Sequence, residues 1–303
     1  MFNFISLLPI VILLSSGYFS KKVKIIKQKQ AKTLLDFAIN FALPCLIFKK
    51  IYYLTLDYSL IILILIGLLS CVISALFAIA IGKIFNFSKA TLASMFLLSC
   101  FGNTIVIGMP IIESVLSDPK FVGEVILYDA IATTLPASIF GPFILSFGND
   151  KKISLTNEIK KIASFPPFLA LFLGFICKPF VLPSFIFSSL DLFGNSAIPI
   201  ALFALGLKLK FSEINTSFKP TIIVIVSKMI LAPLILILFL KFFNFELKNS
   251  AIMAIIESAT PTMTLASIMI IKAGLDSRLA INTIAFGILF AFISIPILLQ
   301  LIL

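Results

Sequence analysis

Two short stretches of polar and helix-breaking residues stand inside long apolar runs, and their residue types could bind a ligand. The first is Phe101-Gly102-Asn103-Thr104-Ile105-Val106-Ile107-Gly108-Met109-Pro110, within an apolar run from about 90 to 115. The second is Ala259-Thr260-Pro261-Thr262. A proline removes a backbone donor and clashes with the carbonyl four residues before it. Such a break survives at membrane depth only where it is buried in protein or lines a water-filled cavity. We therefore predict that the two stretches form two halves of one binding site.

The first stretch has the chemistry of an anion site. Asn103 is placed to cap the following helix, whose free N–H groups and partial positive charge would attract a carboxylate. The alternative is that Asn103 only hydrogen-bonds a neighbouring helix. The threonines beside Pro261 likewise either line the cavity or donate to carbonyls that the proline leaves free. The residues expected to bind substrate are Asn103, Thr104, Gly108, Pro110, Thr260, Pro261 and Thr262.

Three charged residues fall deep inside apolar runs: Asp129, Lys228 and Glu257. Each costs roughly 3 kcal/mol on membrane-insertion scales, so each should have a partner or a function. Glu257 lies four residues before Pro261, on the same helix face as the break. One interpretation is a structural ion pair among the three. The other is that Lys228 holds an anionic substrate while a carboxylate takes up a proton or a cation. The chain has no histidine, so a proton carrier would have to be a carboxylate.

The composition is that of a membrane protein: 60% of the 303 residues are hydrophobic, 12% are charged, and the mean hydropathy is +1.18. About 20 apolar residues cross a bilayer, which predicts an all-α integral membrane protein with ten transmembrane helices. They are expected at 2–20, 33–54, 57–84, 88–115, 121–147, 164–183, 185–209, 218–243, 247–273 and 276–302. The net charge of +11 comes from lysines in the connecting loops, so it does not indicate a nucleic-acid partner.

The distribution of positive residues predicts the topology. Loops after the odd-numbered helices hold 17 of the 24 Lys and Arg residues, and positively charged loops stay on the cytoplasmic side. Both termini are then expected outside the cytoplasm, in a bacterial inner membrane. The lysines follow the first apolar segment rather than precede it, which favours a retained helix over a signal peptide.

The two halves of the chain repeat each other. Residues 35–44 and 190–199 share Leu, Asp, Asn, Ala and Pro at matching positions, and Lys83-Ile-Phe-Asn-Phe recurs as Lys241-Phe-Phe-Asn-Phe. A unit of five helices forces the second copy through the membrane upside down, a pattern typical of secondary transporters with a midplane site. We expect repeats at 1–147 and 164–303, a cytoplasmic linker at 148–163, and one broken helix in each copy, the fourth and the ninth.

These motifs resemble a known family. Phe101-Gly102-Asn103-Thr104 leading to Gly108-Met109-Pro110 is similar to the fourth-helix signature of the auxin efflux carriers, which include plant PIN-type carriers and bacterial malate and organic-acid permeases. Ala42-Leu43-Pro44-Cys45-Leu46-Ile47-Phe48 is similar to the second-helix motif. The stretch ending Leu205-Gly206-Leu207-Lys208 is similar to the seventh, and 259–296 also fits. The resemblance therefore covers the whole chain in order.

The resemblance implies ten helices in two inverted five-helix repeats, with the broken fourth and ninth helices crossing at the centre. It also implies a scaffold part and a transport part that move as an elevator, with Asn103 meeting the substrate carboxylate. The short connection at 148–164 resembles bacterial members and argues against auxin itself as the substrate.

We therefore expect a secondary transporter of malate-like or other organic anions. The alternative is a sodium- or proton-coupled cation carrier of related fold, which would need paired acids at the crossing. Membrane-embedded enzymes are disfavoured, because a chain with no His and no C-x-x-C has few ways to build a nucleophile–base pair or a metal site. The four cysteines lie in apolar runs without metal-ligand spacing. We expect no cofactor or metal, with coupling to protons or sodium left open. The expected partners are the organic anion, the lipid bilayer and a second copy in a homodimer.

Overall fold

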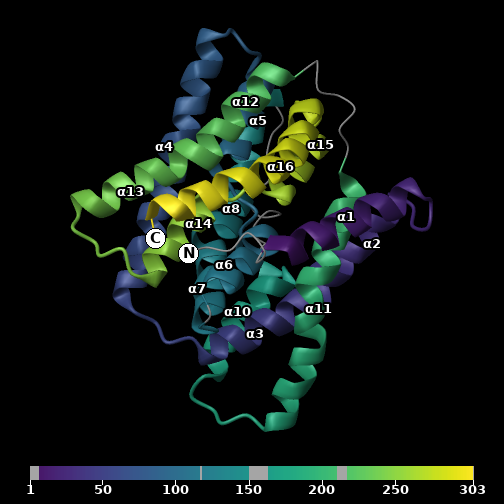
Figure 1. Ribbon diagram of the computed structural model, residues 1–303, viewed down its shortest axis with the longest axis vertical. Coiled ribbons are helices and arrows are strands. Elements are labelled where there is room, and N and C mark those ends of the chain that lie inside the picture. The colour runs from purple at the N-terminus through teal and green to yellow at the C-terminus, as the bar shows by residue number, and fades with distance from the viewer. Residues whose placement is uncertain (1–6, 117, 150–162, 210–216, 303) are drawn as a thin grey trace.

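The computed structural model describes residues 7–116, 118–149, 163–209 and 217–302 (Figure 1). These ranges are helical and contain no strand beyond one isolated bridge between Gly102 and Thr262. The α-helices are α1 (Leu8–Lys22), α2 (Gln30–Phe37), α3 (Leu43–Tyr53), α4 (Tyr58–Ile84), α5 (Lys89–Cys100), α6 (Met109–Val115), α7 (Lys120–Tyr128), α8 (Leu135–Asn149), α10 (Pro166–Cys177), α11 (Ser184–Lys208), α12 (Phe218–Val226), α13 (Ala232–Phe242), α14 (Asn249–Ser258), α15 (Thr264–Ala273) and α16 (Ser277–Ile302). Four π-helical segments join some of them: η2 (Ala38–Ala42), η3 (Thr104–Gly108), η4 (Asp129–Thr134) and η6 (Ser227–Leu231).

Six continuous helical stretches in the described ranges are long and apolar enough to cross a membrane. They are Gln30–Tyr53, Tyr58–Ile84, Lys120–Asn149, Ser184–Lys208, Phe218–Phe242 and Ser277–Ile302. The other expected spans coincide with shorter helices: α1, α10, α5 with α6, and α14 with α15. Most of the expected linker falls on 150–162, outside the described residues.

Each π-helical segment ends two residues before a proline, namely Pro44, Pro110, Pro136 or Pro233. A proline ring clashes with the carbonyl four residues back and offers it no N–H. That carbonyl lies inside the π-helical segment in every case, so the wider turn makes room for the ring. One detail of the expected break is therefore wrong. The chain stays helical through Pro110 and is non-helical earlier, at 101–103.

The helices form two groups (Figure 1). In the first, α1, α2 and α3 pack on the long helix α11, and α10 packs on α3. In the second, α4 packs on α5 and α13, α5 packs on α8, and α16 packs on α12 and α15. Contacts between the groups pass through α7, which lies on α3, and through η3, which lies on α11.

The first group is held by an unusually close helix contact. A Cβ atom on Gly17 of α1 would lie 2.0 Å from the carbonyl oxygen of Phe203, and one on Gly206 of α11 would lie 2.1 Å from that of Leu14. Small residues let helix backbones approach in this way, and dispersion between the backbones then holds the helices together. α1 and α11 therefore form a tightly packed pair.

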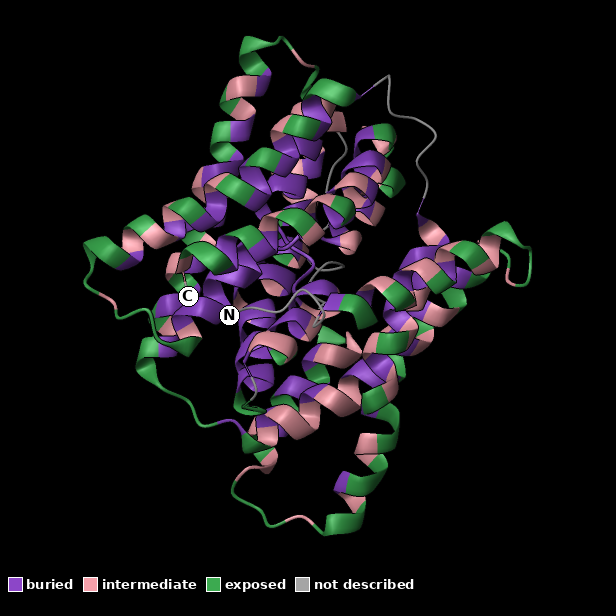
Figure 2. Ribbon diagram, in the orientation of Figure 1, coloured by how far each residue is buried: buried purple, intermediate pink, exposed green. Residues whose placement is uncertain are grey.

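Burial follows the same plan (Figure 2). Buried residues gather along the inner segments, whereas the outer faces expose large apolar side chains such as Leu65 and Leu69 of α4 and Leu192 of α11. Water-soluble monomers rarely expose apolar surface on this scale. The outer faces are therefore suited to contact lipid.

Candidate functional site: the crossing of two non-helical segments

Two non-helical segments meet in the middle of the second helix group. The N–H of Asn103 donates to the carbonyl of Pro261 at 2.7 Å, and the N–H of Met263 donates to the carbonyl of Phe101 at 2.9 Å. These bonds make Gly102 and Thr262 an antiparallel bridge. The structure thus brings together the two stretches that the sequence singled out, separated by about 160 positions in the chain.

Two threonines satisfy carbonyls that the non-helical segments leave open. Thr260 Oγ1 donates to the carbonyl of Glu257 at 2.7 Å, where Pro261 has no N–H to offer. Thr262 Oγ1 crosses to the other segment and donates to the carbonyl of Leu98 at 3.0 Å. Both hydroxyl protons are therefore used by backbone carbonyls, but only Thr260 donates to the carbonyl that Pro261 leaves without a helical donor. Pro261 itself is buried.

Asn103 occupies the N-cap position of the helix that starts at Thr104. Its side chain makes no capping hydrogen bond; instead Nδ2 donates to Thr264 Oγ1 at 3.2 Å. Its backbone carbonyl accepts from the N–H groups of Ile107 and Gly108. The first N–H groups of the helix, near Thr104 to Val106, have no acceptor within the helix. They remain available to a ligand with negative charge.

Asp129 is buried at the start of η4, beside the crossing. It accepts hydrogen bonds on both oxygens: Thr104 Oγ1 donates to Oδ1, and Thr134 Oγ1 donates to Oδ2 at 2.7 Å. Thr104, predicted to bind substrate, therefore uses its hydroxyl proton on Asp129. Hydrogen bonds of this kind stabilise a carboxylate away from water.

Lys228 in η6 is 1% exposed, so its charge does not reach the surface. Its Nζ donates to the carbonyl of Ser258 at 2.6 Å and lies 3.6 Å from Cys71 Sγ. The amine also faces the crossing, because a Cβ atom built on Gly102 would lie 3.1 Å from Nζ. Among the described residues, no ion pair joins Lys228 to either buried acid.

Glu257 lies near the end of α14, one helical turn before Pro261, and is fully buried. Neither carboxyl oxygen has a hydrogen-bond partner in the described part of the chain. Asp129 and Lys228 are its electrostatic neighbours. The carboxyl group lies against η3, because a Cβ atom on Gly108 would fall 2.3 Å from Oε2. Glycine at position 108 therefore makes room for Glu257, while Pro110 lies two residues further on and is only partly buried.

Sequence reasoning missed three members of the cluster. Tyr128 is buried and its hydroxyl has no hydrogen-bond partner among the described residues, while Thr134 and Thr264 bind Asp129 and Asn103. Tyr128 directly precedes Asp129 in the sequence, which is a weak signal. Nothing local marks the two threonines, because their partners come into reach only through the helix packing.

The described residues contain no group of three or more His, Cys, Asp or Glu side chains placed to hold a metal ion. The arrangement instead combines helix N–H groups, an ammonium and two buried carboxyl groups, and such a set can bind a small anion and exchange a proton.

Comparison with known proteins identifies the family of the chain. Residues 2–299 match the profile of the family described as membrane transport protein. Uncharacterized transporters of Methanocaldococcus jannaschii (25% identical, 91% of each chain) and Methanothermobacter thermautotrophicus (27%, 96% of each chain) are similar over nearly their whole length. The mouse lysosomal cholesterol signaling protein is 28% identical over 72% of this chain and 27% of its own length. The chain is an integral membrane protein and belongs to the membrane transport protein family, that of the auxin efflux carriers.

Proposed function

We propose that this protein is a secondary transporter of small organic anions, with the substrate carboxylate bound at the crossing. The observation that carries the proposal is the pairing of two features there. Helix N–H groups without an intrahelical acceptor follow Asn103, and the buried ammonium of Lys228 faces Gly102. Both attract negative charge, and both lie where the two non-helical segments meet.

Alternating access would come from movement between the two helix groups. The site belongs to the second group, while η3 packs on α11 of the first. In an elevator cycle, the second group would slide along the first and carry the crossing from one membrane face to the other. The first group, with its closely packed α1 and α11, would serve as the scaffold and as the surface for a homodimer.

Two structural correspondences support an inverted repeat of five helices. Asn86 after α4 and Asn244 after α13 both have φ of +54°, at positions that the sequence repeat aligns. Asp36 of α2 interacts electrostatically with Lys208 of α11, while Asp191 of α11 pairs with Lys49 of α3. An inverted repeat would place ten spans in the membrane with both termini on the same side, which the lysine distribution predicts to be the outside.

The alternative is a carrier for sodium or protons as the main cargo. Asp129 and Glu257 favour it, because two buried carboxyl groups lie near the crossing. Lys228 argues against it, since its ammonium repels a metal cation from the same site. We therefore place the organic anion first.

The test is uptake by purified protein in proteoliposomes, against a panel of monocarboxylates and dicarboxylates with and without sodium. Asn103→Ala should abolish uptake at an unchanged protein level, because it removes the side chain beside the bound carboxylate. Asn249→Ala, at the exposed start of α14, is the matched control and should transport normally. Wild-type affinity in Asn103→Ala would remove this residue from the site. Sodium-driven cation flux without any carboxylate uptake would favour the alternative.

A further inference from the structure

The two buried acids beside the crossing are not equivalent. Asp129 receives a hydroxyl hydrogen bond on each oxygen. Glu257 is at least as deeply buried and receives none. An ionised carboxylate without donors is strongly disfavoured in a low-dielectric interior, and it persists there only when a positive charge pairs with it or a proton neutralises it.

The positive charge available to Glu257 is Lys228. The two side chains interact electrostatically, yet Nζ donates to the carbonyl of Ser258, the residue next to Glu257. The same Nζ faces Gly102 at the crossing, where the substrate carboxylate is proposed to bind. One ammonium group thus lies within reach of two competing negative charges, the substrate and Glu257.

The remaining ionisable groups near Glu257 do not replace Lys228. They are Asp129 from η4 and Tyr128 from α7, with Cys71 of α4 and Cys100 of α5 beside them. None of these groups is a cation at neutral pH. A metal cation is disfavoured because Lys228 repels it and because the described residues lack a three-ligand cluster.

We infer that Glu257 is the proton-binding residue that couples anion transport to protons, by competing with the substrate for Lys228. When the anion binds at Lys228, the Glu257 carboxylate loses its counter-ion and takes up one proton from solution on a carboxyl oxygen. When the anion leaves, the carboxyl group releases that proton and pairs with Lys228. The buried site carries the same net charge in both states, so one anionic charge and one proton move together.

This inference rests on the proposed anion transport, so the experiment separates the two. The probe is the carboxylate that the panel selects. Two rates are measured in proteoliposomes: exchange of labelled for unlabelled substrate at equal pH, and accumulation driven by an inward proton gradient. Wild type should do both, and a pH-sensitive dye inside the vesicles should report acidification that depends on substrate.

Glu257→Gln should lose accumulation and substrate-dependent acidification, and the pH dependence of its exchange should flatten. Its exchange should fall less than its accumulation, because the amide leaves Lys228 to the substrate. Glu113→Gln, at an exposed glutamate of α6, is the matched control and should accumulate substrate as wild type does. The inference would be overturned if Glu257→Gln still accumulated substrate against its concentration gradient when an inward proton gradient is applied. Exchange without accumulation in wild type would overturn the coupling but leave anion transport standing.

Infrared difference spectroscopy provides a readout independent of flux. Adding substrate to wild-type protein should increase the C=O stretching band of a protonated carboxylic acid, and Glu257→Gln should lack this increase. An unchanged band in wild type, under conditions where the substrate binds, would show that Glu257 does not take up the proton.

Discussion

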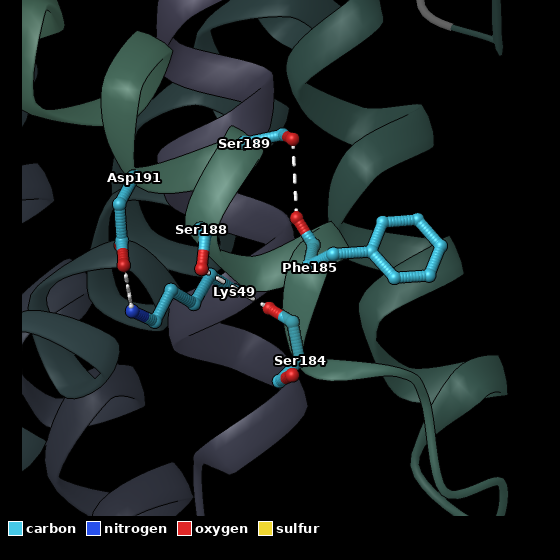
Figure 3. Close-up of polar contacts among 6 residues, drawn as sticks. All are labelled: Lys49, Ser184, Phe185, Ser188, Ser189 and Asp191. Atoms are coloured by element: carbon cyan, nitrogen blue, oxygen red, sulfur yellow. Dashed lines mark hydrogen bonds and ion pairs between the residues drawn. The ribbon is translucent and has the colours of Figure 1, made fainter.

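A lysine lies near a carboxylate in two regions of this molecule, but only one of the two pairs forms an ion pair. Between α3 and α11, Lys49 Nζ lies 2.6 Å from both oxygens of Asp191 (Figure 3), and the two side chains remain 28% and 43% exposed. At the crossing, Lys228 and Glu257 are buried, and no ion pair between them is formed.

The two pairs differ in their consequences for stability. Lys49 and Asp191 form an ion pair that joins two helices of the first group. Partly exposed ion pairs of this kind contribute about 0–1 kcal/mol to the free energy of unfolding. A buried pair left open is destabilising, because both groups have lost water without gaining each other. The open pair therefore supports the ligand-binding role proposed for the crossing, and four predictions test the contrast between the two pairs.

The largest effect is expected from Lys228→Met. Methionine keeps much of the side-chain volume and removes the charge, and hydrogen bonds to charged groups contribute about 1.5–3 kcal/mol. Uptake at low substrate concentration should fall about 10- to 100-fold, as measured by initial rates in proteoliposomes. Normal anion transport by this variant would contradict a role for the charge.

Gly108→Ala should destabilise the protein by about 1–3 kcal/mol, the usual range for overpacking. The new Cβ would lie 2.3 Å and 2.5 Å from the two oxygens of Glu257. Thermal unfolding in detergent measures the loss, and combining the change with Glu257→Ala should restore most of it. Gly287→Ala, whose Cβ would lie 3.2 Å from Pro261 Cβ, is the milder control. Equal losses in both single variants would argue against close contact between Gly108 and Glu257.

In substrate-saturated protein, where Glu257 is inferred to be neutral, Glu257→Met should raise the unfolding temperature, whereas Gly108→Ala lowers it. The change to methionine removes buried polar atoms without partners, and each such group costs about 1–3 kcal/mol. Asp191→Leu removes an acid from the ion pair with Lys49 and should lower the unfolding temperature slightly. If Glu257→Met and Asp191→Leu shifted the unfolding temperature in the same direction, the two pairs would not differ in their effect on stability.

The smallest effect is expected from Lys49→Met. Its pair with Asp191 is partly exposed, so the loss should be at most about 1 kcal/mol and should shrink as salt screens the charges. Substrate exchange should be unaffected, because the pair lies outside the crossing. A large loss of exchange would place the α3–α11 interface in the transport cycle.

The interrupted stretches and the buried lysine of the candidate site could be predicted from local sequence. Pro261, Pro110 and the glycines around Asn103 mark where a membrane helix is interrupted, because their backbone constraints hold in any surroundings. Lys228 stands in the middle of a long apolar run, so its burial was also predictable. The exact position of the non-helical segment was harder to predict, because a π-helical turn accommodates Pro110 and the chain is non-helical at 101–103 instead.

The helical membrane class, the two interrupted stretches and the three charges within apolar runs can all be read from the residues. Which of these groups meet is known only from the folded chain: Asn103 meets Pro261, Asp129 meets Thr104, and Lys228 meets Ser258 rather than Glu257. The physical reason is that helix-forming hydrogen bonds join residues a few positions apart. Contacts between side chains on different helices depend on how each helix is rotated and packed against its neighbours.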